Sequence, residues 1–110
     1  MKAVDMIKSL ERRIITDDID ESEAGVFHFI LTGEGGGEYT VELKNKKIKV
    51  YEGLRGNPDC EIKAKAADYE ALERGELNPQ WAYLSGKIKV SNLVQLLKFK
   101  SHFRKLSDEF

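Results

Sequence analysis

The segment Leu77-Asn78-Pro79-Gln80-Trp81-Ala82-Tyr83-Leu84-Ser85-Gly86-Lys87-Ile88-Lys89-Val90 contains the signals for a helix start, a helix stop and a strand. Asn78 is a favourable N-cap, and Pro79 follows it at the first helical position, where proline sacrifices no hydrogen bond. Gly86 can adopt the left-handed conformation that commonly ends a helix. The apolar residues of Lys87–Val90 alternate with lysines, which predicts a half-buried strand. The segment pairs no nucleophile with a base, so it indicates binding of an apolar ligand rather than reaction with one.

Four more segments show the same alternation of apolar and polar residues. The five predicted strands are residues 26–31, 38–43, 48–51, 60–64 and 87–90. Short turns join the first three, which is typical of an antiparallel meander. Most of these strands are apolar on one face and charged on the other, so the sheet should have one face in water. The opposite, dry face needs a cover.

Helical patterns provide this cover. Residues 2–15 predict an amphipathic helix. A shorter helix is predicted with Asp68 as its cap and Gly75 at its end, and a last helix over residues 92–106, where Asn92 and Gln95 have the spacing of a capping box. The apolar arc of the last helix is wider than packing on a sheet requires, so this helix is either fully buried or part of a cavity wall. The sequence therefore predicts an α+β fold with a five-stranded, largely antiparallel sheet, covered on one face by helices, as a single domain over residues 1–110.

Composition narrows the class of protein. The 110 residues are 34% charged with a net charge of −1, which lacks the basic excess of a nucleic-acid binder. Cys60 is the single cysteine and cannot form an internal disulfide, which indicates a reducing compartment and, by default, the cytoplasm. No apolar run approaches the ~20 residues that span a membrane.

Other candidate motifs lack part of what their chemistry needs. The Gly33–Gly37 run joins two strands and has Glu38 in place of a dinucleotide-binding glycine. The acidic stretch from Asp18 has partial calcium-loop spacing but lacks the glycine and the bidentate acid. His28 and His102 have no ligand partner at metal-site spacing, and Cys60 is expected to be a small buried side chain. We therefore predict no catalytic residue, no metal site and no cofactor.

A family resemblance rests on the order of several segments. Asp59-Cys60-Glu61-Ile62-Lys63-Ala64 and Ala67–Glu76 lead into Leu77-Asn78-Pro79-Gln80 and Gly86-Lys87-Ile88-Lys89-Val90. This order, together with Glu42-Leu43-Lys44-Asn45, resembles the sterol carrier protein type-two family. The resemblance implies an apolar tunnel between sheet and helices that binds sterols, fatty acids, fatty acyl-CoAs or phospholipids. Ser91-Asn92 stands where the family usually has glycine, and Ala82-Tyr83-Leu84 replaces its Ala-aromatic-aromatic step, which leaves the ligand's identity open.

The resemblance, with the apolar arc of the last helix, also suggests which side chains contact the ligand. The predicted ligand-binding residues are Phe27, Phe29, Val41, Trp81, Tyr83, Leu84, Leu93, Leu96, Leu97, Lys100, Phe103 and Arg104. The sequence is equally consistent with Trp81 and Tyr83 lining a pocket and with both being ordinary core residues. Lys100 and Arg104 either cover apolar surface with their stems or form a cationic tunnel mouth for a carboxylate or phosphate.

The sequence thus predicts a non-catalytic intracellular carrier of a lipid or another apolar small molecule. The alternative is an accessory module that presents the same groove to a protein partner in lipid metabolism. Whether the protein contacts membranes transiently, or forms a homodimer, is left open by the sequence.

Overall fold

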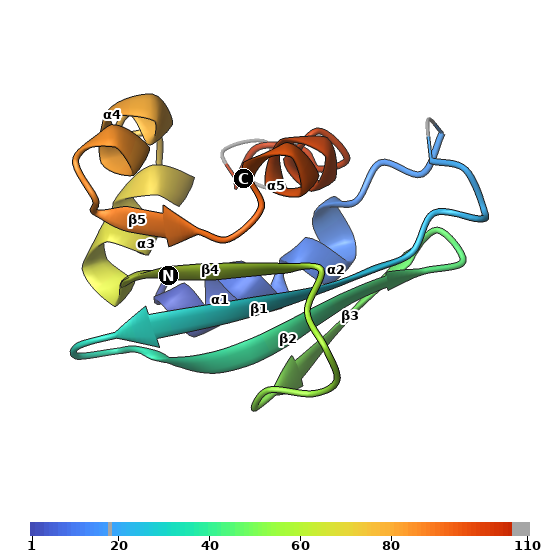
Figure 1. Cartoon of the computed structure of the whole chain (residues 1–110), viewed down its shortest axis with the longest axis horizontal. Coiled ribbons are helices and arrows are strands. Elements are labelled where there is room, and N and C mark those ends of the chain that lie inside the picture. Colours follow the sequence, from blue (N-terminus) through green and yellow to red (C-terminus); the bar gives the residue numbers. More distant parts are fainter. Residues whose placement is uncertain (18, 107–110) are drawn as a thin grey trace.

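The computed structural model describes residues 1–17 and 19–106, which form one five-stranded sheet with helices packed beside it (Figure 1). The strands are β1 (Gly25–Thr32), β2 (Gly37–Lys44), β3 (Lys47–Glu52), β4 (Cys60–Lys65) and β5 (Ile88–Val90). The helices are α1 (Ala3–Lys8), α2 (Leu10–Arg13), α3 (Ala66–Glu73), α4 (Pro79–Leu84) and α5 (Leu93–Lys100). The α+β class and the five strands are confirmed.

The strands lie in the order β3-β2-β1-β4-β5. The pairs β1–β2, β2–β3 and β4–β5 are antiparallel, whereas β1 and β4 are parallel. The sheet is therefore mixed but mostly antiparallel, as predicted. The parallel pair forms because the chain returns after the β1–β3 meander to the free edge of β1.

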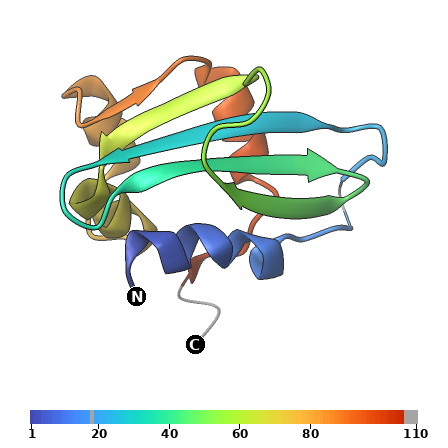
Figure 2. The same ribbon diagram turned by 90° about the horizontal axis from the view of Figure 1, so that it is seen from below.

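The inner face of the sheet carries the core. Phe27 lies opposite Val41 on β2 and Cys60 on β4, and all three are at most 3% exposed. Figure 2 shows α5 crossing behind the strands, while α1 and α2 run below them in that view. Three helices thus bring their apolar sides to the sheet, with Met6, Ile7 and Phe99 among the buried residues.

The outer face is not as open to water as the alternation predicted. His28 and Thr40 face each other across β1 and β2, and both are buried. The loop after β3 covers them, because His28 Nε2 donates to the carbonyl oxygen of Arg55 at 2.8 Å and Thr40 Oγ1 donates to that of Gly53 at 2.8 Å. The Arg55 guanidinium lies 4.0 Å from the ring centre of Tyr51. These contacts satisfy the polar groups that the loop buries.

Three helix signals of the sequence are confirmed. The Asn78 side chain accepts a hydrogen bond from the Trp81 amide at 3.0 Å, and the Asn92 side chain accepts one from the Gln95 amide at 3.2 Å. Gly86 has φ +82° after α4. The expected cap at Asp68 was wrong, since α3 already begins at Ala66, immediately after β4.

Two predicted helices were too long. The helix expected over residues 2–15 is divided at Ser9, whose Oγ donates to the carbonyl of Met6 at 2.6 Å. The last helix ends at Lys100 instead of Leu106. Beyond it the chain bonds back to the segment after α2, since Ile15 N donates to His102 O at 2.7 Å and Arg104 N donates to Arg13 O at 2.8 Å. This tertiary pairing outweighs the helical pattern of residues 101–106.

A buried arginine joins these segments. Arg13 is 2% exposed, and its Nε donates to Ser9 Oγ at 2.9 Å while its Nη2 donates to Met6 O at 3.1 Å. The same guanidinium forms an ion pair with Glu73 at the end of α3. Its Nη1 also lies 3.4 Å from the carbonyl oxygen of Arg104, a weak contact. Arg13 therefore links α1 and α2 to α3 and to the segment after α5.

We expect Glu73→Ala to lower the free energy of unfolding by about 3 kcal/mol, because it leaves the buried Arg13 cation without its counter-charge. Urea denaturation measures the change. Glu76→Ala is the matched control: Glu76 pairs with Arg74 at the surface, where ion pairs contribute at most about 1 kcal/mol. Equal losses for the two variants would contradict the structural role of Arg13.

Candidate functional site

A cavity of about 800 Å³ lies over the inner face of the sheet, beside β4 and β5. Its floor includes Phe29, Ile62 and Ile88 from three strands, and its walls come from α3 with the loop after it and from α5 with the segment after it. The lining residues are Leu10, Arg13, Phe29, Ile62, Tyr69, Leu72, Glu73, Arg74, Gly75, Glu76, Leu77, Asn78, Pro79, Ile88, Leu96, Phe99, Lys100, Phe103, Arg104, Lys105 and Leu106. In Figure 1, α3 and α4 lie to the left of α5, and all three helices contribute residues to the lining.

Residues at the two ends of the loop between α3 and α4 determine its course along the cavity. Gly75 has φ +75°, a conformation that a residue with Cβ adopts only with strain, and it lets the Glu76 amide donate to Ala71 O at 2.8 Å. Asn78 then starts α4. On either side of Gly75 the chain exposes the charged pair Arg74–Glu76, with 3.0 Å between Arg74 Nε and Glu76 Oε1. The loop thus gives the cavity a polar border.

Aromatic contacts hold the opposite wall. The rings of Phe27 and Phe99 stack with their centres 3.9 Å apart, and Phe103 meets Phe99 edge-on at 4.8 Å. On the floor, Phe29 meets Tyr69 edge-on at 5.9 Å. Such pairs contribute about 0.5–1.5 kcal/mol beyond burial, and they fix α5 and the segment after it on the sheet. The wall of the cavity is therefore apolar and anchored.

Besides the Arg74–Glu76 pair, the charged groups of the cavity fall into two sets. Glu73 accepts hydrogen bonds from Arg13 and from Tyr69 Oη, the latter at 3.3 Å. Burial, and then the nearby Glu73 charge, raise the pKa of Tyr69 well above its usual value, so its hydroxyl remains a donor. The second set, Lys100 and Arg104 together with Lys105, is exposed and cationic. These cations favour an anionic group at this border.

Five of the twelve predicted ligand-binding residues border the cavity: Phe29, Leu96, Lys100, Phe103 and Arg104. Phe27 and Val41 are buried in the core outside the lining. The other five also lie outside the lining and are between 36% and 82% exposed: Trp81, Tyr83, Leu84, Leu93 and Leu97. Ala82 is the only residue of α4 that is buried. A ligand contact of any of the twelve remains a prediction.

Sequence reasoning missed the polar group at Arg13 and Glu73. A signal was present, because Arg13 follows Met6 and Leu10 at helical spacing and so falls on the apolar face of the predicted helix. A cation at such a position needs a buried partner. Glu73 lies four residues after Tyr69, which is also buried, so a search for paired charges on apolar faces would have found both.

A second acidic residue, Glu23, links the loop before β1 to α5 and to the turn that follows it. Glu23 Oε1 lies 3.1 Å from Lys98 Nζ and 3.3 Å from His102 Nε2. The hydrogen bond from Lys98, ahead of the attraction of His102, lowers the pKa of Glu23. His102 thus contacts the carboxylate that also pairs with Lys98, and it does not project freely into water.

The other candidate groups are separate from the cavity. Cys60 is buried, its Sγ donates to the Asn92 carbonyl at 3.4 Å, and burial raises the pKa of its thiol. Within residues 1–17 and 19–106, no three His, Cys, Asp or Glu side chains gather as a metal site would need. Asp18, where the calcium-like spacing begins, lies outside the described residues.

Known proteins are similar to this chain both in sequence and in architecture. The model of the SCP-2 sterol transfer family matches residues 7–103. Sterol carrier protein 2 of Gallus gallus is 40% identical over 81 residues, which are 70% of this chain and 15% of that protein. Hydroxysteroid dehydrogenase-like protein 2 of Xenopus laevis is 30% identical over 84 residues, 76% of this chain and 20% of that protein. The chain spans about a fifth or less of these two relatives.

Two solved structures share the fold. The solution structure of palmitated SCP2L2 from Aedes aegypti has a TM-score of 0.70 at 23% identity, with 94% of this chain and 99% of that chain covered. The inverting sec-alkylsulfatase Pisa1 from Pseudomonas sp. has a TM-score of 0.74 at 16% identity, with 91% of this chain but 16% of that chain covered. The family model covers most of the chain, and on that ground the protein belongs to the SCP-2 sterol transfer family.

Proposed function

We propose that the protein is a non-catalytic carrier that holds the hydrocarbon part of one lipid in the cavity beside β4 and β5. The observation that carries this proposal is the cavity itself: about 800 Å³, with an apolar floor and wall and exposed cations at its border. Ligand pockets generally measure about 300–1,000 Å³ and combine an apolar lining with a few polar groups. A fatty acid or fatty acyl-CoA fits this pattern best, with its anionic group near Lys100 and Arg104.

The energetics suit a carrier that also releases its ligand. Each buried methylene contributes about 0.8 kcal/mol, so a chain of ~16 carbons gains roughly 12 kcal/mol. Association and ordering cost on the order of 4–15 kcal/mol. Since the gain lies within the range of the cost, the net affinity is moderate and the ligand exchanges. The structural neighbour from Aedes aegypti is described as palmitated, which supports an acyl chain as the ligand class.

The contacts within the cavity support binding rather than catalysis. The carboxylate of Glu73 is occupied by Arg13 and Tyr69, and Tyr69 keeps its proton. Glu76 is occupied by Arg74. Paired groups of this kind shape and polarise a cavity without offering an accessible base. The thiol of Cys60, with its raised pKa, lies outside the lining.

A second proposal is an accessory module that presents its apolar groove, or the lipid in it, to a partner enzyme. The matched relatives favour it, because this chain corresponds to a small share of a longer protein named for hydroxysteroid dehydrogenases. In that case the cavity would bind free fatty acid poorly without its partner. Displacement of a fluorescent fatty acid from the isolated chain separates the two proposals.

We expect Leu96→Trp to weaken binding of a fluorescent fatty acid about tenfold or more, because the indole occupies cavity volume. Leu97→Trp is the matched control on the neighbouring residue, whose side chain is 57% exposed and outside the lining. Displacement titration gives both affinities, and a urea denaturation curve checks that each variant is folded. A stronger effect of Leu97→Trp would place the ligand elsewhere on α5.

We also expect the double variant Lys100→Gln/Arg104→Gln to weaken hexadecanoate at least about fivefold while hexadecanol is nearly unaffected. Both ligands have the same hydrocarbon chain, so the difference isolates the charge. Competition against the same fluorescent fatty acid supplies the two affinities. Equal changes for acid and alcohol would mean that the cations do not contact the headgroup.

A further inference from the structure

Two buried donor groups beside the cavity form only long hydrogen bonds within the described part of the chain. Tyr69 is 7% exposed, and its Oη lies 3.3 Å from Glu73 Oε2, whereas a hydroxyl donor usually lies about 2.5–3.0 Å from its acceptor. Arg13 is 2% exposed, and its Nη1 lies 3.4 Å from the carbonyl oxygen of Arg104. Both Tyr69 and Arg13 line the cavity. Because buried polar groups generally have a good partner, these two donors indicate a partner that enters the cavity from outside.

The carboxylate of Glu73 brings the two donor residues together. Its Oε2 accepts from Arg13 Nη2 and, at the longer distance, from Tyr69 Oη. Its other oxygen, Oε1, accepts no hydrogen bond from the residues that the structure describes. We call the side chains of Arg13, Tyr69 and Glu73 the Tyr69 cluster. The cluster offers two donors and one acceptor next to the apolar floor of the cavity.

The charges of the cluster determine which ligand group it can bind. The ion pair of Arg13 and Glu73 has no net charge, so the cluster does not attract an anion. A ligand carboxylate would also lie beside the carboxylate of Glu73, which is unfavourable. A hydroxyl group accepts from Tyr69 or Arg13 and donates to Glu73, so it completes the bonding of the cluster. Burial raises the pKa of Tyr69, which keeps its hydroxyl a donor at neutral pH.

We propose that the Tyr69 cluster binds a hydroxyl group on the ligand's hydrocarbon, so that the cavity prefers hydroxylated long-chain acids to unsubstituted ones. This inference rests on the proposed carrier function and narrows its ligand class. The cluster adds specificity that hydrocarbon contacts do not provide, because an unsubstituted chain leaves its donors and its acceptor without new partners.

The position of the hydroxyl on the ligand follows from Arg104. Its amide donates to Arg13 O at 2.8 Å, while its side chain, with Lys100, belongs to the cations that border the cavity. The Tyr69 cluster therefore lies beside the segment where the anionic group of the ligand is expected. We infer a hydroxyl near the carboxylate end of the acyl chain. A sterol also carries a hydroxyl, but it lacks the anionic group that these cations favour.

Competition against a fluorescent fatty acid, with the unaltered chain, measures the preference. We expect 3-hydroxyhexadecanoate to compete about fivefold or more better than hexadecanoate, because it gains hydrogen bonds to charged groups. We expect 16-hydroxyhexadecanoate, with its hydroxyl at the far end, to show no such gain. The two enantiomers of 3-hydroxyhexadecanoate should differ in affinity, since directional hydrogen bonds favour one arrangement at the substituted carbon.

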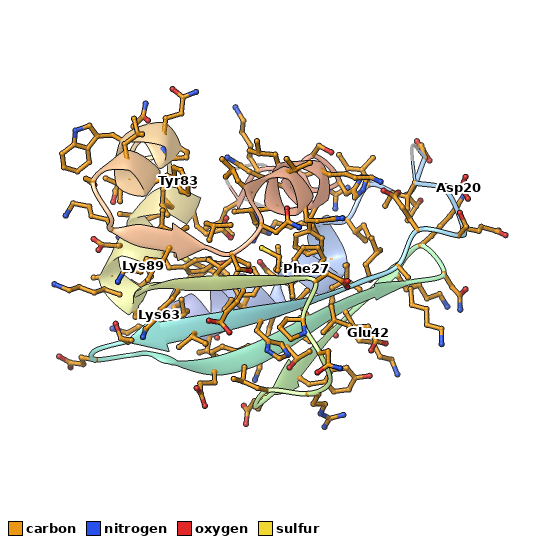
Figure 3. The ribbon with its side chains drawn as sticks, viewed as in Figure 1. Asp20, Phe27, Glu42, Lys63, Tyr83 and Lys89 are labelled. Carbon is orange, nitrogen blue, oxygen red and sulfur yellow. The ribbon has the colours of Figure 1, made fainter. Side chains whose placement is uncertain are left out.

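A conservative variant assigns the preference to the cluster. We expect Tyr69→Phe to reduce the ratio of the two affinities, 3-hydroxyhexadecanoate over hexadecanoate, to about one. Tyr39→Phe is the matched control, because Tyr39 is also 7% exposed but lies outside the lining. Tyr83→Phe is a second control, on an exposed tyrosine of α4 (Figure 3). Both controls should keep the ratio, and urea denaturation checks that each variant folds.

The competition series tests the proposal even if Tyr69→Phe does not fold. Equal affinities of the unaltered chain for hexadecanoate and both enantiomers would overturn the proposal while the carrier function stands. A ratio that survives in folded Tyr69→Phe, or a gain for 16-hydroxyhexadecanoate alone, would remove the assignment to the Tyr69 cluster. Cholesterol that competes better than both acids would overturn the preference for hydroxylated acids. Failure of every acid to displace the probe would instead contradict the carrier function itself.

Discussion

The guanidinium of Arg13 is the group on which three separate parts of the chain converge. A cation at this depth is stable only with partners, and these come from α1 and Ser9, from Glu73 on α3, and from the backbone after α5. Arg13, Glu73 and Arg104 also border the cavity. The space beside β4 and β5 is thus bounded partly by a hydrogen-bonded frame, which keeps its shape through directional contacts. These polar contacts act together with the aromatic contacts that anchor the opposite wall.

In the proposed carrier, the apolar and the charged parts of the cavity have different roles. Ile62, Ile88 and the aromatic wall of α5 would supply hydrocarbon contacts, which give affinity without distinguishing one acyl chain from another. The exposed cations would distinguish headgroups by charge. The outward sides of α4 and α5 are apolar as well, so these two elements carry hydrocarbon on both of their faces. For that reason their total apolar content exceeds what covering the sheet demands.

Local patterns predicted the strands, the caps at Asn78 and Asn92, and the stop at Gly86, because each depends on neighbouring residues. Long-range contacts determine the features that these local patterns did not predict. Residues 101–106 keep a helical pattern, yet their backbone pairs with the segment after α2. The lining of the cavity was predicted only in part, since an apolar residue on α4 or α5 serves a cavity or an exposed surface equally well in sequence. Leu96 and Leu97 illustrate this: they are adjacent and identical, but only Leu96 borders the cavity.

The parallel pairing of β1 with β4 predicts an order for the events of folding. The β1–β2–β3 meander closes short loops, which costs little chain entropy. Pairing Phe27 with Cys60, and joining Arg13 to a residue 91 positions away, requires much larger loops to close. From these loop lengths, we expect the half of the molecule that bears the cavity to assemble after the meander. Substitutions in the meander should alter the rate of folding, whereas those in the cavity walls should act mainly on the rate of unfolding.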